Sequence, residues 1–240
     1  MKPKSNHPSS ENDFLLHQTE DGRTRIQCRF ADKSYAPRLA VGDRLAFRLR
    51  ANPTIARKEE GKKNSPRHDV VMDAQYQLLR EVAAEMAFPT DGEKSTIKKR
   101  IIDGWRQLRE PSGIEEKLRD IISENERYAG VRTHAVKPGE LLELALKARM
   151  DKALETWLTG RSERLGFALV RDNSKGRLKF QAEGYQWHAL PRKGKVAGFS
   201  SVDFEGVVEV TDGELFAKAL FDGIGPAKGF GCGLMLVQRV

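Results

Sequence analysis

The chain has 240 residues and a formal net charge of +8 at pH 7, because 42 Lys and Arg outnumber 34 Asp and Glu. Hydrophobic residues make up 39% and charged residues 32%, a composition that excludes a largely disordered protein and allows one large or two small domains. The positive charge favours a polyanionic partner, either nucleic acid or an anionic membrane.

The sequence lacks the patterns of membrane, secreted and metal-binding proteins. No apolar run reaches the roughly 18 residues of a membrane span, and no signal-peptide core follows the polar start. Cys28 and Cys232 are too few for a disulfide framework and lack metal-ligand spacing, so each is expected to fill an apolar gap. We therefore expect a soluble, cytoplasmic protein with no membrane partner, no metal and no other cofactor.

The N-terminal part of the chain predicts a lead-in followed by strands. Residues 1–13 are rich in Pro, Ser, Asn and Lys, which predicts disorder, and order is expected from Phe14. Apolar and polar residues alternate over 24–30 and over 44–50, as is typical of half-buried strands. The second strand places three arginines on one face and its apolar residues on the other.

This arginine face continues into a basic segment. Between residues 44 and 68, eight Lys and Arg stand against two Glu. A strand edge that leads into a flexible basic loop suits a phosphate backbone, although a solvated charged loop explains the same pattern. The candidate binding residues of this segment are Arg48, Arg50, Asn52, Arg57, Lys58, Lys62, Lys63 and Arg67.

A helical block follows, because apolar residues recur at helical spacing from about residue 72 to 160. The pattern and its Pro and Gly breaks predict four helices, over 74–86, 95–108, 114–122 and 139–158. We expect the aromatic residues of this block, Trp105, Tyr128 and Trp157, to be core residues and not base-stacking platforms.

Strand patterns return after Gly160, over 165–170, 177–190 and 201–210. Seven Lys and Arg against two acids between residues 171 and 195 form a second basic segment at a strand and loop junction. Its candidate binding residues are Lys175, Arg177, Lys179, Arg192, Lys193 and Lys195. Asp212 is the expected N-cap of a helix that leads to a last strand near 234–237, an order that fits a ferredoxin-like half.

Five glycines lie within 223–233 around Lys228, between that helix and the last strand. The spacing does not fit the Walker loop, which requires a hydroxyl residue directly after its lysine. It does not fit the dinucleotide fingerprint either, because that motif lies between a strand and a helix, in that order. Glycine allows close backbone approach, so the loop is a candidate anion site. The alternative, that the glycines form a turn that serves only packing between the helix and the strand, stays open. The candidate binding residues are Gly223, Gly225, Lys228, Gly229 and Gly231.

Three motifs follow one another along the chain: FRLRANP at 47–53, FEGVVEVTD at 204–212, and GIGPAK at 223–228 followed by GCGL at 231–234. With these motifs the chain resembles CasE, the CRISPR repeat-RNA endoribonuclease family of the type I-E Cascade complex and a branch of the RAMP superfamily. The resemblance implies an α+β fold of tandem ferredoxin-like domains with a helical insertion between them. The implied divisions are a lead-in at 1–13, an incomplete N-terminal domain at 14–72, the helical part at 73–160 and a C-terminal domain at 161–240.

The resemblance also implies a function in CRISPR RNA processing. It implies that the repeat hairpin of precursor crRNA is bound along a basic groove, cleaved without metal at the 3′ base of the hairpin, and retained in the complex. Such cleavage needs a base for the 2′-hydroxyl, an acid for the leaving oxygen and cations for the phosphorane charge. The implied partners are the crRNA and the other Cascade subunits, with DNA contacted only through the complex.

The sequence departs from the family at its start. Family members begin with a strand and a helix that bear the catalytic histidine. In this chain, the segment that follows those two elements in the family already begins near residue 7. None of the histidines, His7, His17, His68, His134 and His188, matches the motif of the catalytic one. His17 and His68 are candidate replacements, although an ordinary structural histidine explains each of them.

Three explanations of this start, and three classes of function, stay open. The natural protein begins upstream, or a second polypeptide supplies the strand and helix, or the chain binds the hairpin without cleaving it. The functional classes are an endoribonuclease, an RNA-binding module and a scaffold subunit whose helical block docks onto another protein.

Overall fold

The computed structural model describes residues 14–18, 24–28, 37–58, 65–105, 107–108, 112–128, 130–131, 137–172, 176–191 and 197–240. The chain divides into two compact units, Met1–Pro37 and Arg38–Val240. In the first unit, β1 (Phe14–Gln18) and β2 (Thr24–Cys28) form an antiparallel hairpin. The strand predicted over 24–30 is therefore present over its described residues, 24–28, and residues 29 and 30 lie outside the described residues.

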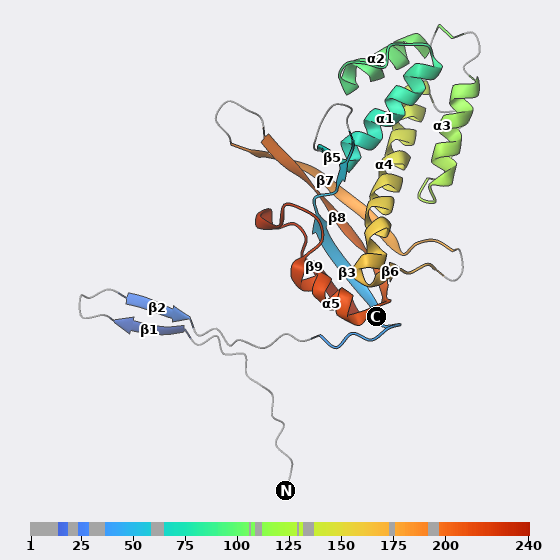
Figure 1. Cartoon of the computed structure of the whole chain (residues 1–240). Coiled ribbons are helices and arrows are strands. Elements are labelled where there is room, and N and C mark those ends of the chain that lie inside the picture. Colours follow the sequence, from blue (N-terminus) through green and yellow to red (C-terminus); the bar gives the residue numbers. More distant parts are fainter. Residues whose placement is uncertain are drawn as a thin grey trace. The chain divides into compact units, whose positions relative to one another are not determined.

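One antiparallel sheet organises the second unit (Figure 1). Its strands are β3 (Arg44–Ala51), β6 (Phe167–Leu169), β7 (Phe180–Leu190), β8 (Ala197–Val210) and β9 (Met235–Arg239). The order is β6-β8-β3-β9, with β7 also paired to β8. With helical connections after β3 and after β8, this is the split βαβ arrangement of a ferredoxin-like domain, so the predicted α+β class is confirmed.

The position of β3 differs from the predicted division of the chain. The predicted division places residues 44–51 in an N-terminal domain, whereas in the structure they lie between β8 and β9. Leu45, Phe47 and Leu49 are buried on one face of β3, and pairing with β8 and β9 satisfies the backbone groups along both of its edges. Residues 38–240 thus contain one complete ferredoxin-like sheet with the helical block in place of its first helix.

Two helices cover the buried face of this sheet. They are the C-terminal half of α4 (Pro138–Ser162) and α5 (Gly213–Asp222), whose side chains share one core with β3 and β8. Trp157 of α4 stacks on Phe204 of β8 with ring centroids 5.6 Å apart. Asp212 caps α5 by accepting hydrogen bonds from the N–H groups of Glu214 and Leu215, as predicted.

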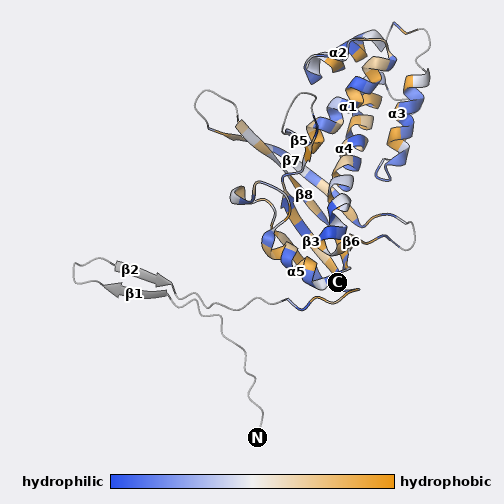
Figure 2. Cartoon of the chain, in the orientation of Figure 1, coloured by the Kyte–Doolittle hydropathy of each residue, from blue (hydrophilic) through white to orange (hydrophobic). Residues whose placement is uncertain are grey.

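The predicted helical block is confirmed, with α1 (Val70–Glu85), α2 (Lys94–Trp105), α3 (Ser112–Glu124) and the N-terminal half of α4. These helices enclose a second core that includes Leu78, Ile101, Leu118 and Leu142. Figure 2 shows hydrophobic and hydrophilic residues on every helix of the block, as expected of amphipathic helices. Trp105 is buried in this core and Tyr128 is half-buried against it, whereas Trp157 is buried in the core of the sheet, so all three have the predicted core role.

A short hairpin occupies part of the segment that the sequence predicted to be a flexible loop. β4 (Thr54–Ala56) pairs with β5 (Arg67–Asp69), and Thr54 lies opposite Asp69. Two further backbone bonds, from Arg57 to Pro66 and from Val70 to Pro53, hold this hairpin closed. The expectation of a structureless loop over 51–68 is therefore wrong for its described residues, since paired backbone groups order both ends.

The far ends of β7 and β8 project from the sheet as a two-stranded arm (Figure 1). Residues 197–201 of β8 pair with β7, while β3 pairs only with residues 202–209 of β8. Two 3₁₀ turns, η1 (Glu163–Leu165) and η2 (Lys228–Phe230), complete the described elements. No helix among the described residues is long and apolar enough to cross a membrane.

Candidate functional site

The glycine-rich loop between α5 and β9 is a closed and anchored structure. Gly223 ends α5 with a φ of 73°. The N–H of Ile224 donates to the carbonyl of Gly233 at 2.8 Å, and the N–H of Gly233 donates to the carbonyl of Arg50 at 2.7 Å. The first bond joins the two ends of the loop and the second ties the loop to β3, so its shape is determined by the sheet.

The N–H groups of two candidate glycines are used inside the protein. Gly223 donates to Ala219 at 2.9 Å and Gly231 donates to Lys228 at 3.1 Å. These N–H groups do not point at an anion, which corrects the expectation of a backbone cradle at these two positions. Gly229 is exposed, and no heavy atom would lie within 4 Å of a Cβ built on it.

The loop glycines instead make room for the side chain of Lys228. A Cβ built on Gly223 would lie 3.6 Å from Cε of Lys228, and one built on Gly233 would lie 3.3 Å from its Cγ. The aliphatic stem of Lys228 therefore packs over both glycines while the residue as a whole stays exposed. Gly225, with a φ of 86°, packs against the ring of Trp157.

A hollow of about 440 Å³ lies beside the loop. Gly223 to Pro226 line one part of it, the β4–β5 hairpin contributes Arg67, and the end of α4 and η1 contribute Arg161 and Arg164. No carboxylate lines this hollow, and no ion pair within the described residues involves any of its three arginines. We call these residues the arginine hollow.

Arg161 is the most constrained cation of the arginine hollow. It donates to the carbonyl of Trp157 at 2.7 Å and to that of Thr54 at 3.3 Å, and it lies 4.3 Å over the indole ring of Trp157. Burial and the neighbouring charge of Arg164 lower the pKa of Arg161. Two like charges held side by side favour a bound anion, which would offset their mutual repulsion.

The predicted arginine face of β3 is neutralised by β8. Arg44, Arg48 and Arg50 lie opposite Glu209, Glu205 and Asp203 in the strand register, and their ion-pair distances are 2.9, 3.0 and 2.7 Å. Arg50 donates two hydrogen bonds to Asp203. This face is a ladder of paired charges, so Arg48 and Arg50 are not the free cations that the sequence analysis expected.

Two other candidates of the first basic segment have internal partners. Arg57 donates to the carboxylate of Asp73 in α1, at 2.6 Å for the bond from Nε. Asn52 is buried and its amide donates to the carbonyl of Ser200 at 2.6 Å, so it connects β3 to β8 and does not reach the surface. Lys58 is exposed, and Lys62 and Lys63 lie outside the described residues.

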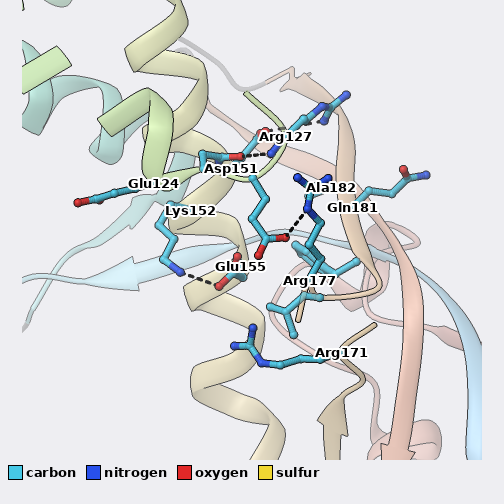
Figure 3. A pocket seen from close by; sticks show the side chains of 13 residues that line it. Glu124, Arg127, Asp151, Lys152, Glu155, Arg171, Arg177, Gln181 and Ala182 are labelled. Atoms are coloured by element: carbon cyan, nitrogen blue, oxygen red, sulfur yellow. Dashed lines mark hydrogen bonds and ion pairs between the residues drawn. The ribbon is translucent and has the colours of Figure 1, made fainter. Parts of the chain in front are cut away.

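Two arginines of the second basic segment, Arg171 and Arg177, line a pocket of mixed charge (Figure 3). Its lining includes four carboxylates, Glu124, Glu126, Asp151 and Glu155, and four cations, Arg127, Lys152, Arg171 and Arg177. Arg177 approaches Glu126 at 3.6 Å, Arg127 approaches Asp151 at 3.7 Å, and Lys152 pairs with Glu155 at 2.7 Å. Burial raises the pKa of Asp151. This balance of charge suits a polyanion less well than the arginine hollow does.

The remaining candidates of this segment are exposed or lie outside the description. Lys179 is exposed, whereas Lys175, Arg192, Lys193 and Lys195 lie outside the described residues. The structure adds Arg161 and Arg164, which lie beyond the end of the predicted helix at Leu158 and outside the two basic segments. The signal for them in the sequence is their spacing of three residues directly after the predicted helix.

The described histidines do not form an evident catalytic group. His68 is half-buried in β5, and His188 lies on β7 with Nε2 at 2.8 Å from the Ser201 hydroxyl. His7, His134 and the side chain of His17 lie outside the description. Burial raises the pKa of the Cys232 thiol, which fits the predicted apolar filler. No cluster of three or more potential metal ligands occurs among the described side chains.

Comparison with known proteins adds a family match. The model of a family described as CRISPR associated protein matches residues 8–239. No curated protein matches the chain.

Several solved structures are similar to the chain. Cse3 of Thermus thermophilus, bound to an RNA representing a pre-cleavage complex, has 21% identity and a TM-score of 0.44, covering 92% of this chain and 64% of that chain. Cas6e from Escherichia coli str. K-12 has 19% identity and a TM-score of 0.40, covering 96% and 86%. A chain of a CRISPR RNA-guided surveillance complex has 15% identity and a TM-score of 0.37, covering 95% and 83%. The chain spans only 64–66% of the length of the first Cse3 structures.

Proposed function

Because the chain belongs to the family of CRISPR associated proteins, which agrees with the resemblance in its motifs, we propose that it binds CRISPR RNA and functions in its processing. The repeat hairpin of the precursor is the proposed ligand. The observation that carries this proposal is the arginine hollow, where three cations from different elements meet the glycine-rich loop without a carboxylate among them.

The chemistry of the arginine hollow supports a phosphate ligand. Guanidinium groups bind phosphate oxygens in a two-pronged geometry, and Arg161 is held in place by two backbone carbonyls and an indole ring. Gly223 and Gly225 line the same hollow, so the glycine-rich loop forms part of the wall that would face the RNA backbone. Lys228 adds an exposed charge on the same loop.

The binding test is the salt dependence of RNA affinity. Replacing Arg67, Arg161 and Arg164 together by Gln should flatten the plot of log affinity against log salt by about 0.7–0.9 for each phosphate that the variant no longer neutralises. A matched control replaces three exposed cations of the helical block, Arg80, Lys99 and Lys147, and removes the same formal charge. An equal reduction of slope in both triple variants would show that the hollow has no special role.

Cleavage is a separate part of the proposal. Incubating the chain with hairpin repeat RNA in EDTA tests whether one cut occurs without metal at the 3′ base of the hairpin. A single cut with a cyclic phosphate end supports an endoribonuclease, and replacing His17 or His68 then tests each as the base. Intact RNA that stays bound supports the alternative function, a hairpin-binding subunit that does not cleave.

We also propose that the chain acts as a subunit of a larger CRISPR RNA complex. The separate core of the helical block supports this, because a block that folds around its own residues leaves its outer face available to a neighbour. Purifying the tagged chain from cells that contain the whole CRISPR operon tests this proposal. Co-purification of RNA without any other subunit would contradict it.

A further inference from the structure

Three aromatic rings form a column between the β7–β8 arm and the glycine-rich loop. His188 of β7 lies directly opposite Phe199 of β8, and their ring centroids are 4.7 Å apart at an interplanar angle of 23°. Phe199 in turn stacks on Phe230 of the loop at 5.1 Å and 28°. The hydrogen-bond contact of His188 Nε2 with the buried Ser201 hydroxyl, at 2.8 Å, holds the first ring in place.

The last ring of this column is open to solvent. Phe230 is 59% exposed, which is unusual for an aromatic residue in an ordered loop. Its neighbours Gly229 and Gly231 have no heavy atom within 4 Å of the positions where a Cβ would lie. Neither chain neighbour of Phe230 therefore has a side chain that could cover its ring.

The backbone holds Phe230 in this exposed position. The N–H of Phe230 donates to Ala227 at 2.9 Å, and Ala227 adopts a left-handed φ of 60° that turns the chain. The N–H of Cys232 also donates to Ala227, at 3.3 Å. An exposed ring that is fixed by its loop loses little conformational freedom when a ligand stacks on it.

The charge around Phe230 favours nucleic acid over protein as the ligand. The glycine-rich loop, residues 223–233, contains Lys228 and no Asp or Glu, and Arg239 is not counted because it pairs with Asp43 at 3.1 Å. Lys228 is exposed two residues before Phe230. Single-stranded nucleic acid is bound by this combination, in which an aromatic ring stacks on a base and a nearby cation contacts the backbone.

We propose that Phe230 is the stacking platform for one unpaired RNA base, which extends the His188, Phe199 and Phe230 column by a fourth ring. Lys228 contacts the phosphate beside this base. The inference rests on the proposed RNA-binding function and adds that the bound RNA has an unstacked nucleotide at the glycine-rich loop, outside the paired stem.

The test uses the full chain and hairpin repeat RNAs that carry 2-aminopurine at each unpaired position in turn. Stacking on Phe230 should quench the fluorescence at one position. Phe230→Leu, which keeps an apolar side chain but removes the ring, should abolish this quenching and weaken binding by about 5- to 150-fold. Phe230→Trp should retain both. Phe221→Leu is the matched control, because Phe221 is an exposed phenylalanine on α5, and it should bind as the unaltered chain does.

An abasic nucleotide provides a second measurement that does not alter the protein. At the quenched position it should weaken binding by the unaltered chain but not by Phe230→Leu. Equal affinity of Phe230→Leu and Phe221→Leu, with quenching unchanged, would overturn the stacking platform and point to a protein contact at Phe230. If the triple variant of Arg67, Arg161 and Arg164 still has a reduced slope of log affinity against log salt in that case, the proposed RNA-binding function stands. Absence of RNA binding by the unaltered chain would overturn both.

Discussion

Arg50 and Asp203 lie opposite each other on β3 and β8, and the guanidinium donates two hydrogen bonds to the carboxylate, at 2.7 and 2.8 Å. The same strand pair holds two further arginine and glutamate pairs. This ladder stabilises the pairing of the central strands and neutralises the exposed face of the sheet. Three arginines that form no ion pair within the described residues lie elsewhere, where the β4–β5 hairpin, the end of α4 and the glycine-rich loop line the arginine hollow.

The pair between Arg50 and Asp203 predicts a small acid dependence of stability. Hydrogen bonds from Arg50 lower the pKa of Asp203, so the pair contributes stability above the ordinary carboxyl pKa of about 3.9 and loses it as pH falls through the lower folded value. Both side chains are largely exposed, so the expected coupling is about 0.2–1 kcal/mol. A double-mutant cycle of Arg50→Gln and Asp203→Asn, measured by urea unfolding at pH 7 and pH 3, checks this. Equal coupling at both pH values would contradict the prediction.

Gly233→Ala is expected to destabilise the glycine-rich loop. Gly233 has a φ of 96°, and a Cβ there would lie 3.1 Å from the carbonyl oxygen of Ile224 and 3.3 Å from Cγ of Lys228. A strained backbone of this kind costs about 1–3 kcal/mol. Gly229→Ala is the matched control, because its Cβ meets no atom within 4 Å, and it should change the free energy of unfolding by less than about 0.5 kcal/mol. Equal unfolding midpoints for the two variants would count against the packing described for this loop.

Local patterns in the sequence predicted most elements of the fold. The four helices, the alternating strands and the Asp212 cap depend on spacing within one segment, and all are present. The β4–β5 hairpin was missed because its strands have only three residues each, too short for a clear alternation.

Pairing between distant segments explains what the sequence did not show about the site. Arg44 and Arg50 were counted as free cations, but their partners Glu209 and Asp203 lie 165 and 153 positions away. In the same way, Arg67 and Arg161 meet at one hollow only because the hairpin packs near the end of α4. Charge counts within a segment cannot separate paired from unpaired cations when strand register decides the pairing.

Leu118→Ala is expected to destabilise the helical block without weakening RNA binding by the folded protein. Leu118 is fully buried in the core of this block, and none of the residues of that core belongs to the core of the sheet. The cavity should reduce the free energy of unfolding by about 2–5 kcal/mol. Urea unfolding followed by circular dichroism, together with RNA titration below the transition, checks both parts. Leu215→Ala on the exposed side of α5 serves as control, and a loss of RNA affinity by folded Leu118→Ala would contradict the separation of the two cores.

Tyr185 is expected to stay protonated well into the alkaline range. Burial and the nearby charge of Asp69 raise its pKa to about 12. Since the ordinary tyrosine pKa is about 10, the folded state favours the neutral phenol, and the stability that this provides is complete below pH 10 and lost as pH rises to about 12. The phenolate absorbance of the unaltered chain minus that of Tyr185→Phe gives the titration of this residue alone. Asp69→Asn keeps a side chain that can cap α1 but removes the charge, so it should lower the pKa of Tyr185. A phenol that titrates near pH 10 in both proteins would show that neither burial nor Asp69 acts on it.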